Sequence, residues 1–166
     1  MFIEEYFVVN GSITIALAQT NPIRGDIERN LAKHLGCISE SASHGADVVV
    51  FPELSITGYE PDLLASLALS PSSSVVSELV NAAIRARVII IAGIPLANDG
   101  RKPYIASLIA FHLAKKCFIA SSIYMKLKAH LLLLVRRILV FPVMALLCIT
   151  VFVLIFRMNS IGKMRP

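Results

Sequence analysis

A short apolar run in the first third of the chain reads Gly-Ala-Asp-Val-Val-Val-Phe-Pro-Glu-Leu at residues 45–54. Its three valines are β-branched and adjacent, which is the pattern of a strand buried on both faces of a sheet. Gly45 is a residue type that ends helices, so we expect a helix before the strand. Glu53 therefore follows a buried strand, directly after a proline, at a strand end where a site can form.

The sequence on both sides of this run alternates between strand and helix patterns. Apolar runs with β-branched residues predict strands, and apolar residues at helical spacing predict helices. The expected strands span residues 13–18, 47–51, 88–94 and 104–111. One expected helix follows Asp26 as its N-cap, and the other spans residues 72–86. Strands that alternate with helices predict a layered α/β domain over residues 13–111.

The same spacing predicts which helix residues face the sheet. In the first helix these are Leu31, Leu35 and Ile38. In the second helix they are Val75, Val76, Leu79, Ala83 and Ile84. We expect both sets to pack against the strands.

Composition restricts the classes of function. The 166 residues are 56% hydrophobic with a net charge of +5, and much of the basic excess lies late in the chain. Aromatic residues do not interleave with these basic ones, so nucleic-acid binding is not expected. The three cysteines are far apart and odd in number, which predicts neither a zinc site nor a disulfide framework. The histidines also lack ligand spacing; we interpret His34, His44, His112 and His130 as solvated or satisfied side chains.

The alternation stops after about His112, and residues 112–166 form a basic and apolar tail. An apolar run spans about 138–156, interrupted only by Pro142 and Thr150. It is long enough to cross a bilayer and has no polar face, which is the pattern of a transmembrane helix. Cationic residues flank it on both sides, so its orientation is left open.

Several motifs within residues 13–111 resemble the nitrilase superfamily, the carbon–nitrogen hydrolases. The most distinctive pair is the Phe-Pro-Glu-Leu motif at 51–54 followed by Thr-Gly-Tyr at 57–59. The opening strand at 16–20 and the Ala-Gly-Ile-Pro segment at 92–95 also resemble family segments. The resemblance implies an α-β-β-α sandwich, of which this chain would contain the N-terminal part.

The resemblance also implies a reaction. Family members use a Glu, a Lys and a Cys to hydrolyse non-peptide C–N bonds, without a metal or an organic cofactor. The thiolate attacks an amide or nitrile carbon, the cation stabilises the developing negative charge, and the carboxylate transfers protons. A small amide or nitrile is therefore the implied substrate. By the same resemblance, a cytoplasmic location and a homo-oligomer are expected.

Only the glutamate maps clearly onto this sequence, at Glu53, as the general base. Lys126 in Tyr-Met-Lys has the shape of the family's lysine motif, but a run of leucines follows it; a solvated or membrane-flanking lysine is the alternative. Cys148 lies inside the apolar run and is interpreted as a buried thiol rather than the nucleophile. Cys37 and Cys117 match no nucleophile position, so the nucleophile is left unassigned.

A change of reading frame within codons 112–117 is one explanation of this mismatch. If each new codon starts at the third base of a present one, Met125-Lys126 reads as Glu, and AGY codons at Ser121 and Ser122 allow a Lys. The permitted string Tyr-Ser-Lys-Gln-Tyr-Leu-His-Glu resembles the family's catalytic-lysine segment. The leucine run would then consist of out-of-frame codons.

Three hypotheses follow. The first is a hydrolase that is truncated or frame-damaged and inactive as written. The second is a hydrolase-like binding protein anchored in a membrane by residues 138–156, which would place it at the membrane. The third is an intact small enzyme that uses Glu53, Lys126 and Cys148.

Overall fold

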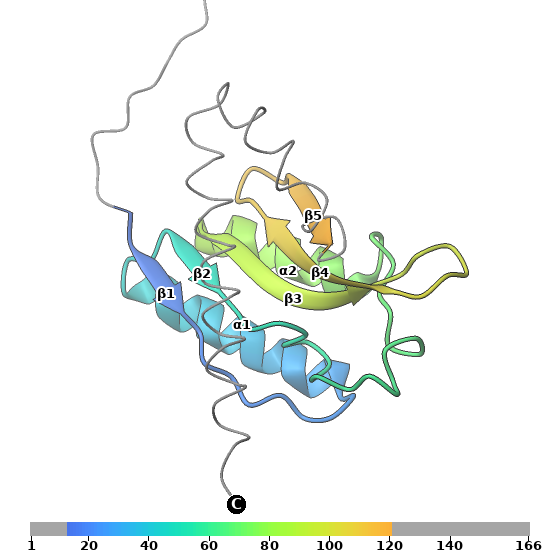
Figure 1. Ribbon diagram of the computed structural model, residues 1–166. Helices are drawn as coiled ribbons and strands as arrows, with labels where there is room; N and C mark the ends of the chain where they lie inside the picture. The colour runs from blue at the N-terminus through green and yellow to red at the C-terminus, as the bar shows by residue number, and fades with distance from the viewer. Residues whose placement is uncertain (1–12, 121–166) are drawn as a thin grey trace, which may run out of the picture.

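The computed structural model describes residues 13–120, and within this range five strands lie side by side in chain order (Figure 1). The elements are β1 (Ile15–Leu17), α1 (Ile27–Ser43), β2 (Val48–Val50), α2 (Ser74–Ala86), β3 (Ile89–Leu96), β4 (Tyr104–Ala110) and β5 (Lys116–Ala120). Strands β1, β2 and β3 are parallel, whereas β4 and β5 continue the sheet in antiparallel pairs. This mixed sheet confirms the α/β class predicted from the sequence.

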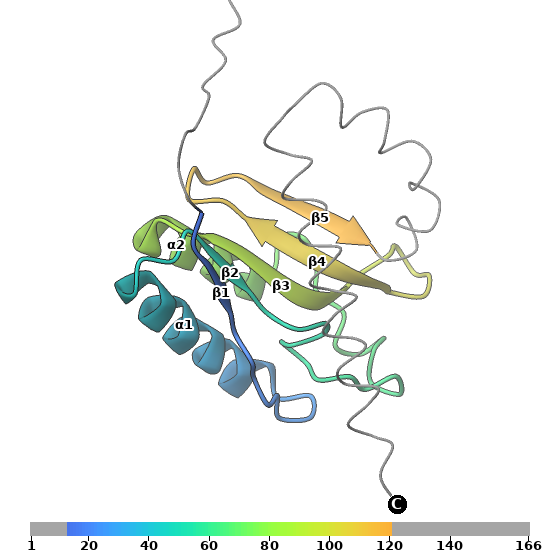
Figure 2. The same cartoon turned by 60° about the vertical axis from the view of Figure 1, so that its left-hand side comes forward.

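Helices α1 and α2 are the two crossover connections of the parallel part, and both cover the same face of the sheet (Figure 2). Parallel neighbours require such a crossover, because the chain must return to the starting edge of the sheet. One consequence is that the carboxyl ends of β1, β2 and β3 all point to one edge. The loops that leave those ends therefore gather at that edge.

Helix α1 begins and ends as its sequence predicts. The Asp26 side chain accepts a hydrogen bond from the Arg29 backbone N–H at 3.0 Å, which satisfies one of the first free donors of the helix. At the other end Gly45 has φ +76°, a conformation that glycine adopts without steric cost. Ile38 is buried, and Leu31 and Leu35 pack against the same core.

Helix α2 corrects one prediction about its inward face. Val76, Leu79 and Ala83 are buried as expected, but Ile84 is 39% exposed. Successive helix positions turn by about 100°, so Ile84 lies past Ala83 on the side away from Leu79. The inward face instead includes Ala82, which is 4% exposed.

Alternation along the strands produces two apolar layers. Val49 and Ile90 point to the helices and form the main core with both of them. On the opposite face lies a second cluster, which consists of Val48, Val50, Ile91 and Ile109 with flanking strand residues. Within residues 13–120 no helix residue belongs to this second-face cluster.

The sheet extends beyond the predicted domain end at residue 111. Strand β5 pairs antiparallel with β4, and the turn between them is closed by the Phe111 N–H, which donates to the Lys115 carbonyl at 2.8 Å. Strand β5 was not predicted, because its five residues begin with a lysine and lack strict alternation. The apolar run at 138–156 lies outside the described residues. In the part of the chain that the structure describes, neither helix is long and apolar enough to cross a membrane.

Candidate functional site

Glu53 lies just past the carboxyl end of β2, the central one of the three parallel strands. The ladder continues to the end of β2, since the Ala18 N–H donates to the Val50 carbonyl at 2.9 Å and the Phe51 N–H donates to the Ile91 carbonyl at 2.8 Å. Two parallel neighbours thus fix the chain until two residues before Glu53. In open α/β sheets this edge is where ligands usually bind.

The turn that carries Glu53 lies flush against β3 at Gly93. A Cβ atom at Gly93 would stand 2.6 Å from the Glu53 Cα atom and would also overlap the Pro52 carbonyl oxygen and the Leu54 backbone nitrogen. All three are backbone atoms, which cannot move aside as a flexible side chain would. Glycine at position 93 is therefore required for the turn to occupy this place.

The turn itself is tightly wound around Leu54. Leu54 has φ +50°, an unusual value for a residue with a side chain, and its side chain is 1% exposed. The Leu54 carbonyl accepts from the backbone N–H groups of Thr57 at 3.0 Å and Gly58 at 2.7 Å. Burial and these hydrogen bonds hold a conformation that costs free energy locally, which is common at functional sites.

Asn30 on α1 ties the turn to the loop before the helix. Its side-chain amide donates to the Ile23 carbonyl at 2.7 Å and to the Ile56 carbonyl at 3.0 Å, while its oxygen accepts from the Ile23 N–H at 2.7 Å. Asn30 is 1% exposed, so these are buried contacts. One side chain thus satisfies three backbone groups from two loops.

His34, one helical turn after Asn30, contacts the same turn. Its Nδ1 lies 2.7 Å from the Asn30 carbonyl oxygen and its Nε2 lies 2.8 Å from the Ser55 hydroxyl. A carbonyl can only accept, so Nδ1 carries the proton and the Ser55 hydroxyl donates to Nε2. The ring also stacks on Phe51, with centroids 4.1 Å apart. Burial lowers the pKa of His34 to about 4, so the ring is neutral at ordinary pH.

Glu53 is half-buried, in contrast to the buried residues 54–58 that follow it in the turn. Burial raises the pKa of Glu53 above its ordinary value. Within residues 13–120 its carboxyl group has no hydrogen bond or ion pair that would favour the charged form. A carboxylate whose proton affinity is raised by desolvation is better suited to accept a proton than a solvated one.

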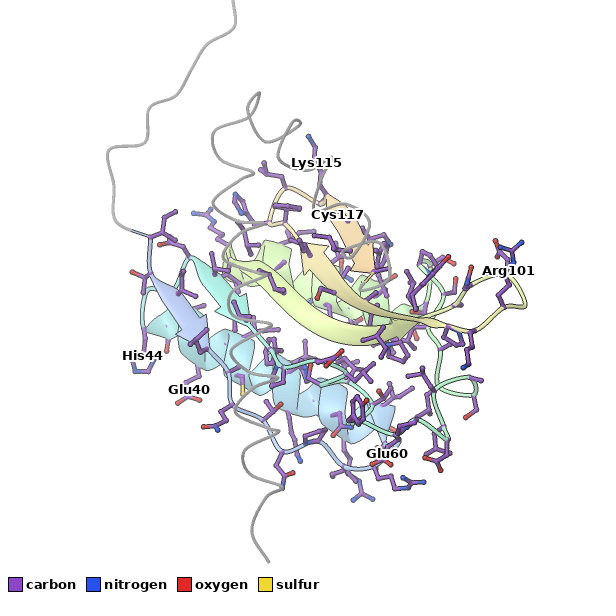
Figure 3. The ribbon with its side chains drawn as sticks, in the orientation of Figure 1. Glu40, His44, Glu60, Arg101, Lys115 and Cys117 are labelled. Carbon is purple, nitrogen blue, oxygen red and sulfur yellow. The ribbon has the colours of Figure 1, made fainter. Side chains whose placement is uncertain are left out.

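The outer side of the turn carries charged groups. Arg24 forms ion pairs with Glu60 and with Asp62, joining the loop before α1 to the segment after the turn. Gly58 has φ +81°, a backbone conformation that favours glycine. Tyr59 beside it is 56% exposed. Figure 3 shows Glu60 at the N-terminal end of α1, on the lower side of the molecule.

The described cysteines do not lie beside Glu53. Cys117 on β5 continues a row across the sheet with Ile109, Ile91 and Val50. Three strand spacings therefore separate it from β2, about 14 Å. Figure 3 shows Cys117 on the opposite side of the molecule from Glu60. Burial also raises the pKa of the Cys117 thiol, which disfavours the reactive thiolate.

The other predicted site residues, Lys126 and Cys148, lie outside the described residues. Cys37 is on α1, where it packs at the margin of the main core. Among residues 13–120 no three side chains of the His, Cys, Asp and Glu types gather in a way that could hold a metal ion.

Sequence reasoning did not assign the residues that support the Glu53 turn, namely Asn30, His34, Ser55 and Gly93. Gly93 did belong to the Ala-Gly-Ile-Pro segment at 92–95, which resembles a family segment, and this was a signal for it. For His34 the sequence offered only the interpretation of a solvated or satisfied side chain. The structure shows that His34 is satisfied and buried.

Comparison with protein families gives a match over most of the chain. The model of the carbon-nitrogen hydrolases matches residues 14–136. A glutamine-dependent NAD(+) synthetase from Thermotoga maritima is 42% identical over 57 residues, which are 34% of this chain and 10% of the relative. A synthetase of the same name from Synechocystis sp. is 42% identical over 59 residues, 36% of this chain and 10% of the relative. The chain thus spans about a tenth of the length of these relatives.

Solved structures share the fold. A CN-hydrolase superfamily protein from Xanthomonas campestris superposes with a TM-score of 0.58 at 19% identity, over 64% of this chain and 39% of that one. An amidase from Nesterenkonia sp. superposes with a TM-score of 0.57 at 22% identity, over 68% of this chain and 43% of that one. At these identities the likeness concerns the fold alone, and it agrees with the nitrilase-type fold predicted from the sequence.

Proposed function

Because the chain belongs to the carbon–nitrogen hydrolase family, we propose that its site is built to hydrolyse a non-peptide C–N bond and that Glu53 is the general base. The observation that carries this proposal is the Glu53 carboxyl: half-buried, raised in pKa, and free of hydrogen bonds and ion pairs within residues 13–120. It stands at the edge where the parallel strands end. A structural carboxylate would instead be expected to have a cation or N–H partner.

The proposed reaction has two stages. Glu53 takes the proton of a cysteine thiol, and the thiolate attacks the amide carbon while a lysine ammonium stabilises the oxyanion. The carbon–nitrogen bond then breaks, and Glu53 returns the proton to the departing nitrogen. Water, deprotonated by the same carboxylate, attacks the thioester and releases the acid and the thiol. No metal or organic cofactor takes part in this scheme.

A small primary amide is the substrate class that we propose. The NAD(+) synthetases are named glutamine-dependent, and glutamine carries a primary amide. In the Nesterenkonia amidase, a mutant shows covalent addition of the acetamide moiety of fluoroacetamide at the active-site cysteine. Nitriles fit the same chemistry, because a thiolate adds to a nitrile carbon as it does to a carbonyl.

As written, the chain is proposed to be inactive. Lys126 is the candidate for the cation, but the leucines after it depart from the family pattern. Cys148 lies inside the apolar run at 138–156 and has no acidic residue near it in sequence. The change of frame within codons 112–117 accounts for both departures. Losing one member of a cooperating catalytic set typically costs several orders of magnitude in rate.

Ammonia release from primary amides and nitriles tests this proposal. Two proteins are compared: the chain as written, and a chain whose reading frame is shifted within codons 112–117. We expect release only from the frame-shifted chain. Release by the chain as written that is lost in Cys148→Ala and kept in Cys37→Ala would instead support the intact small enzyme. Absence of release from both would count against the hydrolase proposal.

The alternative function is a hydrolase-like binding protein held at a membrane. Its specific support is the apolar run at 138–156, which the described residues do not include. Fractionation of cells that produce the chain separates the two proposals. Recovery in the membrane fraction after a carbonate wash favours the anchored protein, whereas loss of all the chain from that fraction excludes it.

A further inference from the structure

His34 contacts the chain on both sides of Glu53. Its ring stacks on Phe51, two residues before Glu53. Its Nε2 accepts a hydrogen bond from the hydroxyl of Ser55, two residues after Glu53. Its own Nδ1–H is anchored on the backbone of α1 at Asn30. A rigid helix is thereby connected, through one planar ring, to both flanks of the turn that carries the carboxyl group.

The pair of His34 and Ser55 has the geometry of a base and a nucleophile, with 2.8 Å between Nε2 and the hydroxyl oxygen. Each residue is, however, only 1% exposed. A substrate cannot reach a hydroxyl group that is shielded in this way. The pair is therefore suited to hold the turn rather than to attack a substrate.

Neither contact is easily replaced by another group. Ser55 sits in the buried part of the turn, and a hydroxyl that loses its acceptor there pays a desolvation cost. The imidazole must also remain neutral to accept the hydrogen bond from the Ser55 hydroxyl, because a charged ring has two donors and no acceptor. Burial of the ring favours the same neutral state, because it lowers the pKa of His34.

From these contacts we propose that His34, acting through Ser55 and Phe51, is a positioning residue that fixes where the Glu53 carboxyl stands. This proposal rests on the proposed role of Glu53 but not on turnover. His34 determines how far the carboxyl is withdrawn from water. If the ring is lost, the turn loosens on the side of Ser55 and the carboxyl becomes more hydrated.

The test follows the titration of Glu53 in the full chain as written. The carboxyl carbons of the glutamates are labelled with ¹³C, and the Glu53 signal is assigned as the one that disappears in Glu53→Gln. The titration is then repeated in His34→Phe, which keeps a flat ring on Phe51, and in the milder Ser55→Ala. His44→Phe is the matched control, because His44, the C-cap residue of the same helix, also bonds a carbonyl four residues earlier, at 2.8 Å, but is exposed.

We expect Glu53 to lose about half or more of its upward pKa shift in both His34→Phe and Ser55→Ala, since each exposes the carboxyl to water. The double variant should change little beyond the larger single effect, because both changes break one hydrogen bond. His34→Gln can still accept a hydrogen bond from Ser55, so it should keep more of the Glu53 pKa shift than His34→Phe does. His44→Phe should leave it unchanged.

The proposal is wrong if Glu53 titrates in Ser55→Ala and in folded His34→Phe as it does in the unchanged chain. It is also wrong if the two single effects simply add, as two independent packing defects would. Failure of the proposed function gives a different result: ammonia release by the frame-shifted chain would then survive Glu53→Gln, while the Glu53 pKa in the chain as written would still respond to the residue at position 34.

Discussion

A Cβ atom added to Gly93 on β3 would lie 2.6 Å from the Cα atom of Glu53. The two residues are forty positions apart, yet no side chain fits between their backbones. The backbone of the proposed general base can occupy this position only because residue 93 on the neighbouring strand has no side chain. A substitution at Gly93 in the sheet would therefore also move the turn that carries Glu53.

Gly93→Ala is therefore expected to destabilise the chain by about 1–3 kcal/mol, because the new methyl group must displace backbone atoms of the Glu53 turn. Urea unfolding followed by circular dichroism measures the change. The control is Gly36→Ala, since a Cβ at this exposed position of α1 would meet no atom within 4 Å. Gly36→Ala should stabilise the helix by about 0.5–1 kcal/mol. Equal stability of the two variants would refute the tight contact at Gly93.

Asn30→Ala should also destabilise the chain, by about 2 kcal/mol or more, because it leaves the Ile23 N–H and the Ile56 carbonyl without a partner, whereas the Ile23 carbonyl keeps its hydrogen bond from the Asp26 N–H. The midpoint of urea unfolding should fall without a change in helix content. Asn81→Ala on the exposed side of α2 is the control, and it should shift the midpoint by much less. A small effect of Asn30→Ala would mean that water replaces these hydrogen bonds at no cost.

The stability of the chain should depend on pH through His34. Its pKa is lowered from 6.5 to about 4 by burial, so between these values the unfolded chain binds the proton more tightly than the folded chain. The neutral ring thus contributes stability above pH 6.5 that is lost as the pH falls toward 4. The full difference corresponds to at most about 3 kcal/mol.

Unfolding free energies at several pH values, for the chain and for His34→Phe, measure this contribution. The difference between them should shrink as the pH falls through this window, since the variant has no group to protonate at position 34. Glu53 acts in the opposite direction: its raised pKa makes stability fall as the pH rises from the ordinary value of a carboxyl through the raised one. Parallel pH profiles of the two proteins would contradict the account of His34.

A fragment of residues 13–120 should not behave as an independent domain. The second-face cluster, Val48, Val50, Ile91 and Ile109, has no described helix against it. These four residues are buried in the whole chain, and an apolar sheet face that becomes exposed drives association in water. We expect the isolated fragment to bind a hydrophobic dye and to aggregate in sedimentation experiments. A monomeric fragment with a cooperative melting transition would count against this expectation.

Helices and strands were predicted correctly from the sequence where a local pattern determines them. The valines of β2 and the cap at Asp26 predicted their elements correctly, because β-branched runs and capping carboxylates act over a few residues. The sequence did not predict features that depend on contacts between residues far apart in the chain. The exposure of Ile84 depends on which arc of α2 meets the sheet, and β5 depends on pairing with β4. His34 could not be assigned, since its partners are brought to it by the turn after β2.

The gene provides a further prediction. If the frame changes within codons 112–117, both Ser121 and Ser122 are encoded by AGY codons, and the shifted frame stays open beyond codon 166. It should encode an apolar strand that ends in a cysteine and is followed shortly by an acid. Sequencing the locus checks this directly. TCN codons at either serine, or early stops in the shifted frame, would exclude the frame change and favour the membrane-anchored alternative.

The most direct test of Glu53 as the general base is its replacement in the frame-shifted chain. Glu53→Gln keeps the size of the side chain but cannot accept the thiol proton, and Glu78→Gln on the exposed face of α2 is the matched control. We predict that kcat for ammonia release falls about a thousandfold or more in Glu53→Gln and is unchanged in Glu78→Gln. Turnover by Glu53→Gln at a rate comparable to the control would contradict the central claim.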